Sequence, residues 1–215
     1  MSQHRIVMLG APGSGKGTAA TEMSVKLKTP TVSTGQMFRE AIKAGGPVGL
    51  KAESFVKSGQ LVPDDVVMEV VREWLMANKG NGFICDGFPR TVAQAEGFDK
   101  LLAQLGKPLT MVILLEVTVE EILERMLGRL VCEKCGASHH VTRLKPKVAG
   151  VCDKCSGKLV TLADDTEATI RDRMRVFNET TMPLADYYQR TGVLQRVDGS
   201  GLAAVANARV LALFD

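Results

Sequence analysis

The sequence contains no long hydrophobic run, no internal repeat and no low-complexity tract. No stretch comes near the roughly 18 consecutive apolar residues of a transmembrane helix, and the polar N-terminus is unlike a signal peptide. We therefore expect a cytoplasmic protein without a membrane partner. The composition, 45% apolar and 24% charged, is ordinary for a soluble globular chain.

A strong charge bias is also lacking, because the formal net charge is only +3. The excess lies in residues 129–165, which hold seven Lys and Arg but four acids. A mildly basic surface suits anionic ligands such as nucleotides and is too weak to predict nucleic acid binding. At 215 residues, the chain can form one sizeable core with inserted segments, or two small domains.

The first distinctive segment is the glycine-rich run GAPGSGKGT at residues 10–18. The apolar residues 5–9 before it predict a buried strand, and the spacing of Met23 and Leu27 predicts a helix after it. This order is typical of a phosphate-binding loop. Glycines let backbone N–H groups converge on an anion, the helix N-terminus adds positive charge, and Lys16 reaches the terminal phosphates. A chance glycine loop is the alternative, which the flanking elements disfavour.

One position departs from the general loop pattern. Gly17 stands where Ser or Thr usually follows the lysine, and Thr18 comes one residue late. The usual contact between a hydroxyl and magnesium must therefore be rearranged or routed through water.

The cysteines predict a metal site. Four of the five form two CxxC pairs separated by 16 residues: Cys132, Cys135, Cys152 and Cys155. In a cytosolic chain this spacing fits a tetrahedral, structural Zn²⁺ held by four thiolates; disulfides or redox pairs are the alternative. His139 and His140 lie between the pairs and are alternative ligands, although four thiolates already fill the shell. Cys85 stands in an apolar run, so we expect a core residue.

Strands and helices alternate along most of the chain. The patterns predict strands at 5–9, 30–32, 82–86, 109–116 and 193–197. They predict helices at 36–44, 48–58, 63–78, 92–105, 118–127, 164–189 (kinked at Pro183) and 202–213. Such alternation gives an α/β fold, a parallel sheet of five strands covered on both faces. Because ligands gather at the C-terminal ends of parallel strands, Asp86 should lie beside the phosphate loop.

Residues 129–165 interrupt this alternation. They are rich in Gly, Lys and Cys, and about 37 residues cannot bury an adequate core unaided. We expect a small inserted domain of hairpins that zinc holds together.

At this point the chain closely resembles the adenylate kinase family, in its bacterial form with a long, zinc-bearing lid. The motifs that carry the resemblance are residues 10–18, STG at 33–35 with Arg39, GQLV at 59–62, DGFPRT at 86–91 with Gln94, and the CxxC pairs. They run from residue 10 to about residue 199. The resemblance implies a core of residues 1–32, 63–128 and 166–215 with the three-layer P-loop NTPase fold. It also implies an AMP-binding insertion at 33–62 and a lid at 129–165.

The activity that the resemblance implies is reversible transfer of the terminal phosphoryl group from MgATP to AMP, which gives two ADP. The implied catalytic residues are Lys16, Asp86, Arg90, Arg125, Arg129 and Arg173. The implied ATP site comprises Gly13, Ser14, Gly15, Lys16, Gly17, Thr18, Arg129, Ser138, His139 and Gly201. The implied AMP site comprises Thr34, Arg39, Gln60, Leu61, Val62, Gly87, Phe88, Pro89, Arg90, Gln94 and Arg173.

Each implied residue has a role in the family. Arg125, Arg129 and Arg173 would surround the transferring group, and Asp86 would place Mg²⁺ through water. His139 would stack on the ATP adenine, which the backbone near Gly201 would also contact. On the acceptor side, the AMP adenine would be read by Thr34, the backbone of 60–62 and Gln94, and the AMP phosphate held by Arg39 and Arg90. Without the resemblance, an arginine on a helix is more often a solvated surface residue.

Two positions depart from the family pattern. Leu130 and Leu162 stand where the family usually has arginines, so we expect an active enzyme whose lid makes fewer charged contacts. Arg143, Lys145 and Lys147 are candidates to replace the missing charges.

Three other functions are compatible with parts of the sequence. A UMP or CMP kinase is the nearest rival, but such relatives have Asn after the Gly-Phe-Pro-Arg run, where this chain has Thr91. A zinc ribbon that binds nucleic acid predicts aromatic residues among the basic ones, and residues 129–165 contain none. A catalytically inactive nucleotide-binding scaffold is suggested only by Leu130 and Leu162. No segment indicates a partner interface, so we expect a monomer.

Overall fold

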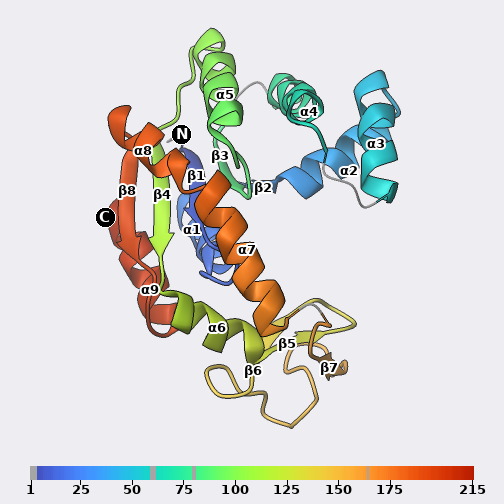
Figure 1. Ribbon diagram of the computed structural model, residues 1–215, viewed down its shortest axis with the longest axis vertical. Helices are drawn as coiled ribbons and strands as arrows, with labels where there is room; N and C mark the ends of the chain where they lie inside the picture. The colour runs from blue at the N-terminus through green and yellow to red at the C-terminus, as the bar shows by residue number, and fades with distance from the viewer. Residues whose placement is uncertain (1–3, 59–61, 79–80, 164) are drawn as a thin grey trace.

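The central element is a parallel sheet, as the sequence predicts. The computed structural model describes residues 4–58, 62–78, 81–163 and 165–215 (Figure 1). In sheet order, the strands are β2 (Thr31–Ser33), β3 (Phe83–Asp86), β1 (Arg5–Gly10), β4 (Met111–Glu116) and β8 (Leu194–Asp198). Every neighbouring pair is parallel, so all five strands end at the same edge of the sheet.

Apolar residues on both faces of the strands explain why the sheet is buried. Because side chains alternate between faces, Ile6 and Met8 pack with the helices on one side, and Val7 and Leu9 with those on the other. The first face is covered by α1 (Lys16–Leu27) and α9 (Ala203–Leu211), which precedes the short 3₁₀ helix η1 (Ala212–Phe214). The second face is covered by α4 (Asp64–Ala77), α5 (Val92–Gln104) and α8 (Pro183–Arg190). The buried Cys85 belongs to this second core, as expected.

The remaining helices lie outside these two layers. The insertion after β2 forms α2 (Thr34–Ala44) and α3 (Pro47–Ser58), which project to one side of the sheet (Figure 1). Over the phosphate loop pack α6 (Val119–Leu127) and α7 (Glu167–Thr180), through Ile122, Met126, Ile170 and Met174. No helix among the described residues is both long and apolar enough to cross a membrane.

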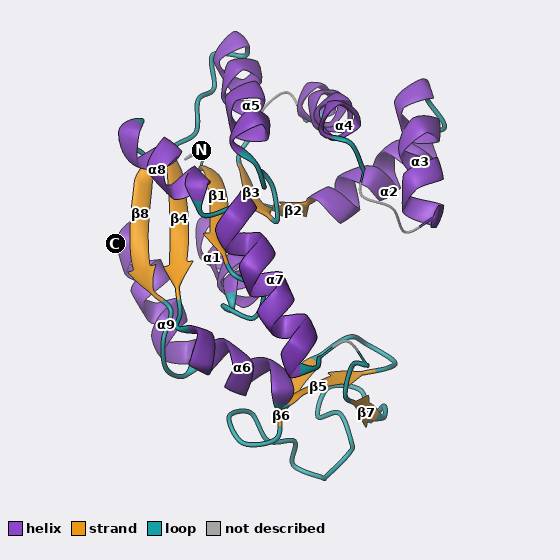
Figure 2. Cartoon of the chain, viewed as in Figure 1, coloured by secondary structure: helices purple, strands orange, loops and turns teal. Residues whose placement is uncertain are grey.

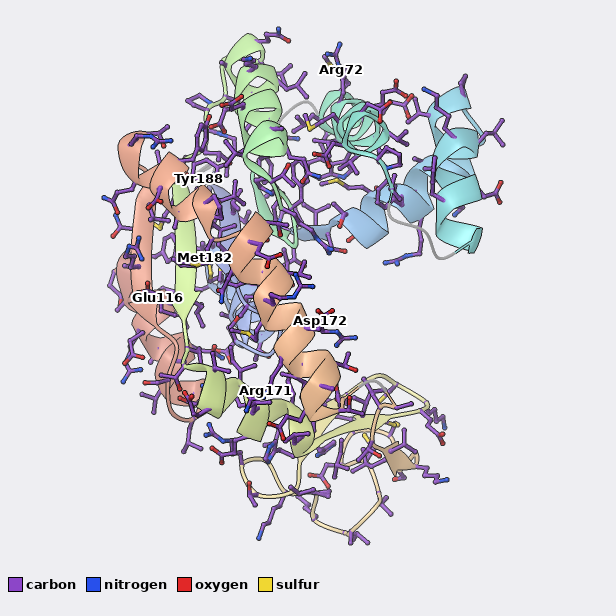
Figure 3. The ribbon with its side chains drawn as sticks, viewed as in Figure 1. Arg72, Glu116, Arg171, Asp172, Met182 and Tyr188 are labelled. Atoms are coloured by element: carbon purple, nitrogen blue, oxygen red, sulfur yellow. The ribbon has the colours of Figure 1, made fainter. Side chains whose placement is uncertain are left out.

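Helix starts follow the expected capping chemistry. Side chains of Ser33, Thr91, Thr118 and Thr166 each accept a hydrogen bond from a backbone N–H in the first helical turn. The expected single helix over 164–189 is wrong, because α7 ends at Thr180 and α8 begins at Pro183. Proline has no N–H to continue the hydrogen-bond ladder, and it is accepted at the first position of a new helix. Met182 occupies the N-cap position of the second helix, at the corner between the two helices, and its side chain makes no capping hydrogen bond (Figure 3).

A separate antiparallel sheet forms within residues 129–165, which we call the lid. Its strands are β5 (Arg129–Cys132), β6 (Ser138–His140) and β7 (Leu159–Val160), in the order β6-β5-β7. Figure 2 shows this sheet beyond α6 and α7, far from the α2–α3 pair. Its core is small, with Leu130 packed against Cys132, Cys152 and Leu159. Thus the hydrophobic residue at position 130 has a packing role in the lid.

We expect Leu114→Ala to lower the free energy of unfolding by about 3 kcal/mol. Leu114 is 2% exposed, in the strand beside β1, so the truncation leaves a cavity in the second core. Urea unfolding followed by circular dichroism measures the change. The control is Val25→Ala on α1, where the side chain is 77% exposed and the loss should stay within about 0.5 kcal/mol. Equal losses in both variants would contradict the assignment of this core.

Candidate active site

The phosphate loop lies where the sequence predicts it, between the end of β1 at Gly10 and the start of α1 at Lys16. Gly13 and Gly15 have φ values of +83° and +97°, which strongly favour glycine. At Gly13 a Cβ atom would also lie 2.8 Å from Met126 of α6. The glycines therefore let the loop turn tightly beneath α6 and point its backbone into the space beside the helix N-terminus.

Lys16 is the cation of this loop. Its Nζ donates to the carbonyl oxygen of Ala11 at 3.4 Å. Burial lowers the pKa of the Lys16 ammonium, the charge of Asp86 raises it, and nearby Arg90 lowers it further. An anion placed between Lys16 and Arg90 would relieve their mutual repulsion.

Asp86 lies beside the loop, as the rule for parallel strands predicts. It is the last residue of β3, paired in register with Met8 of β1. A Cβ atom at position 17 would lie 3.2 Å from Oδ2 of Asp86, closer than most Cβ contacts allow. This approach gives a physical reason for Gly17, because a serine or threonine would crowd the carboxylate.

Several cavities border the loop, and three of them contain most of the predicted site residues. The central cavity, about 400 Å³, is lined by residues that include Gly10, Lys16, Gly87, Arg90, Asp172 and Arg173. The loop cavity, about 280 Å³, is lined by residues that include Gly17, Thr18, Asp86, Arg125, Arg129 and Ser138. The lid pocket, about 340 Å³, is lined by residues that include Ser14, Arg125, His139, Arg143, Leu144 and Gly201. All six side chains predicted to be catalytic line the central cavity or the loop cavity.

Helix α7 forms one wall of the central cavity. Asp172, on α7 (Figure 3), and Arg173 both line it, together with Arg90 from the loop after β3. Arg90 is held by its own turn, because its Nε donates to the carbonyl oxygen of Gly87 at 2.8 Å. Two arginines and Lys16 thus reach one cavity from three different segments of the chain.

Arg129 is fixed by a carboxylate. Its Nε and Nη2 donate to the two oxygens of Asp165 at 2.8 and 2.7 Å, the bidentate geometry that best orients a guanidinium group. Asp165 is nearly inaccessible to solvent, so the pair is well defined. This partner was not anticipated from the sequence, since 36 residues separate the two positions.

Arg125 joins the loop to two other segments. Its Nη1 donates to the carbonyl oxygen of Ser14 at 2.8 Å, and its Nη2 donates to Glu121 at 2.9 Å and to Gly199 at 2.6 Å. Its guanidinium group therefore lies between the loop and residues 199–201 and lines both the loop cavity and the lid pocket.

Only some of the residues predicted to bind the acceptor line one of the three cavities. Gly87, Pro89, Arg90 and Arg173 line the central cavity. Thr34 and Arg39 lie on α2, Val62 is half-buried and Phe88 is buried in the second core, and none of them lines any of the three cavities. Gln60 and Leu61 lie outside the described residues.

Gln94 is buried and firmly oriented. Its Oε1 accepts from the backbone N–H of Arg90 at 2.8 Å, and its Nε2 donates to Asp64 at 2.6 Å. Asp64 also accepts from the hydroxyl of Thr91 at 3.0 Å. This supporting role of Asp64 was not anticipated from the sequence, since about 30 residues separate it from Gln94.

The four cysteines of the CxxC pairs come together in the lid, and their Sγ atoms all lie within 4.8 Å of one another. Burial opposes ionisation of Cys132, but N–H groups of Cys135 and Lys134 lower the pKa of its thiol to about 7. Four sulfur donors at this spacing fit a tetrahedral Zn²⁺ site. His140 lies apart from this cluster and donates to the carbonyl oxygen of Glu124 at 3.1 Å. His139 lies beside the Cys152 thiol, whose pKa it lowers, and also lines the lid pocket.

The three residues proposed to replace the missing lid charges line neither the central cavity nor the loop cavity. Arg143 lines the lid pocket, and neither Lys145 nor Lys147 lines one of the three cavities. Leu162 is 36% exposed, at the end of the lid next to α7.

Comparison with known proteins agrees with this arrangement. The family model described as adenylate kinase matches residues 8–193. The adenylate kinase of Moorella thermoacetica is 52% identical over 197 residues, which cover 91% of each chain. Those of Clostridium botulinum strain Langeland and Carboxydothermus hydrogenoformans are each 46% identical over 91% of this chain and 91% and 92% of their own. With the phosphate loop, the converging arginines and the sheet order in place, these similarities show that the chain belongs to the adenylate kinase family.

Proposed function

We propose the following roles for the residues of this chain in the reaction of an adenylate kinase, the reversible transfer of a phosphoryl group from ATP to AMP. The observation that carries the proposal is the convergence of Lys16, Arg90 and Arg173 on the central cavity, directly beside the loop cavity with Arg125 and Arg129. Phosphoryl transfer requires positioned positive charge rather than a protein nucleophile, because the transition state spreads negative charge over the phosphoryl oxygens. These five cations supply that charge.

The donor phosphates are assigned to the phosphate loop. The backbone of Gly13, Gly15 and Gly17 and the ammonium of Lys16 surround them, while Ser138 of the lid lines the same cavity. The terminal phosphoryl group then lies between Lys16 and the arginines of the central cavity. Arg129 reaches it from the lid in the orientation that Asp165 imposes.

Oxygen donors in the loop cavity fit Mg²⁺. Asp86 and Thr18 both line this cavity, and a carboxylate with a hydroxyl is a donor set that the hard magnesium ion accepts, directly or through water. When bound with ATP, the ion neutralises part of the phosphate charge. Asp86 also favours the protonated form of Lys16, because its negative charge raises the pKa that burial lowers.

The acceptor is assigned to the side of α2. Arg90 binds the AMP phosphate in the central cavity, with Arg39 completing the site from the insertion. Gln94, Thr34 and the segment 60–62 read the adenine. A pyrimidine acceptor is disfavoured, because the relatives that match nearly the whole chain are named adenylate kinases.

Water must be excluded for transfer to prevail over hydrolysis. We assign this task to the insertion 33–62 and to the lid 129–165, which lie on separate sides of the phosphate loop (Figure 2). Their closure over the nucleotides would dry the central cavity and bring Arg39 and Arg129 toward the phosphates. The cytoplasmic location and the monomeric state remain predictions from the sequence.

The acceptor assignment predicts a definite substrate profile. With MgATP as donor, we expect rapid ADP formation with AMP, and rates at least a hundredfold lower with CMP, UMP or GMP. Without an acceptor, ADP formation should be slower still, because the site excludes water. A coupled assay for ADP measures all of these rates. A faster rate with UMP or CMP than with AMP would overturn the assignment of the adenine-reading residues.

The lid assignment predicts a structural Zn²⁺ bound to the four cysteines. Removal of metal with a chelator should lower the melting temperature and unfold the lid while the parallel sheet persists, since the lid core consists of little more than three buried residues. Calorimetry and amide hydrogen exchange distinguish the two regions. Cys132→Ser is the matched variant, and Cys85→Ser, in the second core, should leave the metal content unchanged. A metal-free protein with an unchanged melting curve would contradict a zinc-stabilised lid.

The departure at position 162 predicts a gain from restoring an arginine. Leu162→Arg should lower the KM for ATP severalfold by adding a charged contact to the donor phosphates. The control is Val148→Arg, on a lid side chain that is 61% exposed and lines none of the three cavities. If both variants behave like the parent protein, the idea that this lid lacks a phosphate contact is wrong.

A further inference from the structure

His139 is a buried residue of the lid whose ring lacks an ordinary hydrogen bond. Its side chain is 6% exposed, and neither Nδ1 nor Nε2 has a partner of normal hydrogen-bond geometry within the described part of the chain. The ring of the neighbouring His140 is bonded on both sides, because Nε2 donates to the carbonyl oxygen of Glu124 and Nδ1 accepts from the backbone N–H groups of 142 and 143. An unpaired polar group in the interior is unfavourable, so the His139 ring requires an explanation.

The pairing of β5 with β6 places His139 on the cysteine side of the lid sheet. In the register of these antiparallel strands, His139 lies opposite Leu130. Residues that lie opposite each other project to the same face of a sheet. Leu130 packs there against Cys132, Cys152 and Leu159. The His139 side chain therefore projects to the face on which the sulfur atoms gather.

Two residues of the second CxxC segment lie beside the ring. Nδ1 of His139 lies 4.0 Å from Oδ2 of Asp153, the residue after Cys152. Burial opposes ionisation of the Cys152 thiol, but the neighbouring His139 ring and the backbone N–H groups of Lys154 and Cys155 lower its pKa. The N–H of Lys154 donates to this sulfur at 3.4 Å. His139 thus adds a side-chain donor to the backbone donors around Cys152.

Asp153 is fixed in the position from which it faces the ring. Its Oδ1 accepts a hydrogen bond from the backbone N–H of Lys147 at 3.0 Å. This bond leaves Oδ2 as the carboxylate oxygen nearest to His139. A carboxylate beside the imidazole of a metal site orients the ring and favours its N–H form.

We propose that His139 is a positioning residue of the lid metal site, whose ring N–H donates a hydrogen bond to the sulfur of Cys152 when that sulfur holds the metal. The inference rests on the proposed Zn²⁺ site of the four cysteines. A metal-bound cysteine is a thiolate, which accepts hydrogen bonds more strongly than a thiol does. The His139 ring therefore obtains its full partner only when metal is bound, which explains why no ordinary hydrogen bond is present without it.

The hydrogen bond connects the metal site to the nucleotide side of the lid. Ser138, His139 and His140 of β6 all line the lid pocket. Hydrogen bonds to metal ligands orient the ligands and increase metal affinity. The same contact holds β6, and with it one wall of the lid pocket, against the metal-bearing segment 152–155.

The test measures the Kd for Zn²⁺ of the full-length protein by competition with a chromophoric chelator at constant pH. His139→Phe keeps a planar ring in the lid and removes both ring nitrogens. We expect the Kd for Zn²⁺ to rise about tenfold or more, the usual effect of losing a hydrogen bond to a metal ligand. His139→Gln keeps an N–H donor and should recover part of the affinity.

Replacement of Zn²⁺ by Co²⁺ adds a spectroscopic measurement. The d–d absorption bands of Co²⁺ report how many sulfur ligands it has, and the sulfur-to-cobalt charge-transfer band reports the electron density on those sulfur atoms. Loss of a hydrogen bond raises the electron density on the thiolate. The charge-transfer band of His139→Phe should therefore move to lower energy, while the d–d bands keep the pattern of four sulfur ligands.

His140→Phe is the matched control. His140 lies on the same strand, is buried to the same degree, and is bonded to Glu124 rather than to the cysteine segment. Because it donates to no metal ligand, its replacement should change the Kd for Zn²⁺ by less than about twofold and leave the charge-transfer band in place.

The outcomes separate the inference from the metal site beneath it. If His139→Phe leaves the Kd and the charge-transfer band unchanged, the inference is overturned. Equal losses of affinity in His139→Phe and His140→Phe without a band shift would mean that both act through lid packing, which also overturns it. So would a parent spectrum of three sulfurs and one nitrogen that His139→Phe alters, because His139 would then be a ligand. If the parent protein binds neither metal, the proposed zinc site fails together with the inference.

Discussion

The parallel pairing of β1 with β3 is the constraint on which the site depends. Because the two strands run in the same direction, the phosphate loop after β1 and Asp86 at the end of β3 meet at one edge of the sheet. The approach of that carboxylate in turn favours glycine at position 17. The register between β1 and β3 therefore places the loop, Lys16 and Asp86 close together. Helix α6 packs on the loop.

Much of this arrangement could be predicted because its signals are local in the sequence. The strand, the glycine run and Lys16 are contiguous, the cysteines have a metal-binding spacing, and the end of β3 follows from the geometry of parallel sheets. The partners of the arginines could not be predicted in the same way. Asp165 for Arg129, and Glu121 for Arg143, lie on different elements that only the folded chain brings together. The break between α7 and α8 was missed for another reason, since a proline in a helical pattern is compatible with either a kink or a new start.

In the lid, some residues pack in a small core and others provide charges or sulfur atoms. Leu130, Cys132, Cys152 and Leu159 form its only cluster of packed apolar residues within the described part of the chain. A charged side chain in place of Leu130 would have to leave that cluster. With leucine at position 130, the lid has one positive charge fewer and a better packed core. The neighbouring sulfur atoms would stabilise the lid only when a metal is bound to them.

Concentrating arginines around a phosphate site creates repulsion whenever the nucleotides are absent. In this chain Arg125, Arg129 and Arg143 each donate to a carboxylate: Glu121, Asp165, and Glu121 with Glu124 respectively. The acids offset the repulsion and also fix each guanidinium group before the substrate binds. The loss of side-chain conformational entropy on binding is therefore small. In the central cavity the pKa of the Lys16 ammonium is lowered by burial and by nearby Arg90 and raised by Asp86. An anion bound between Lys16 and Arg90 would therefore reduce the repulsion between these two cations.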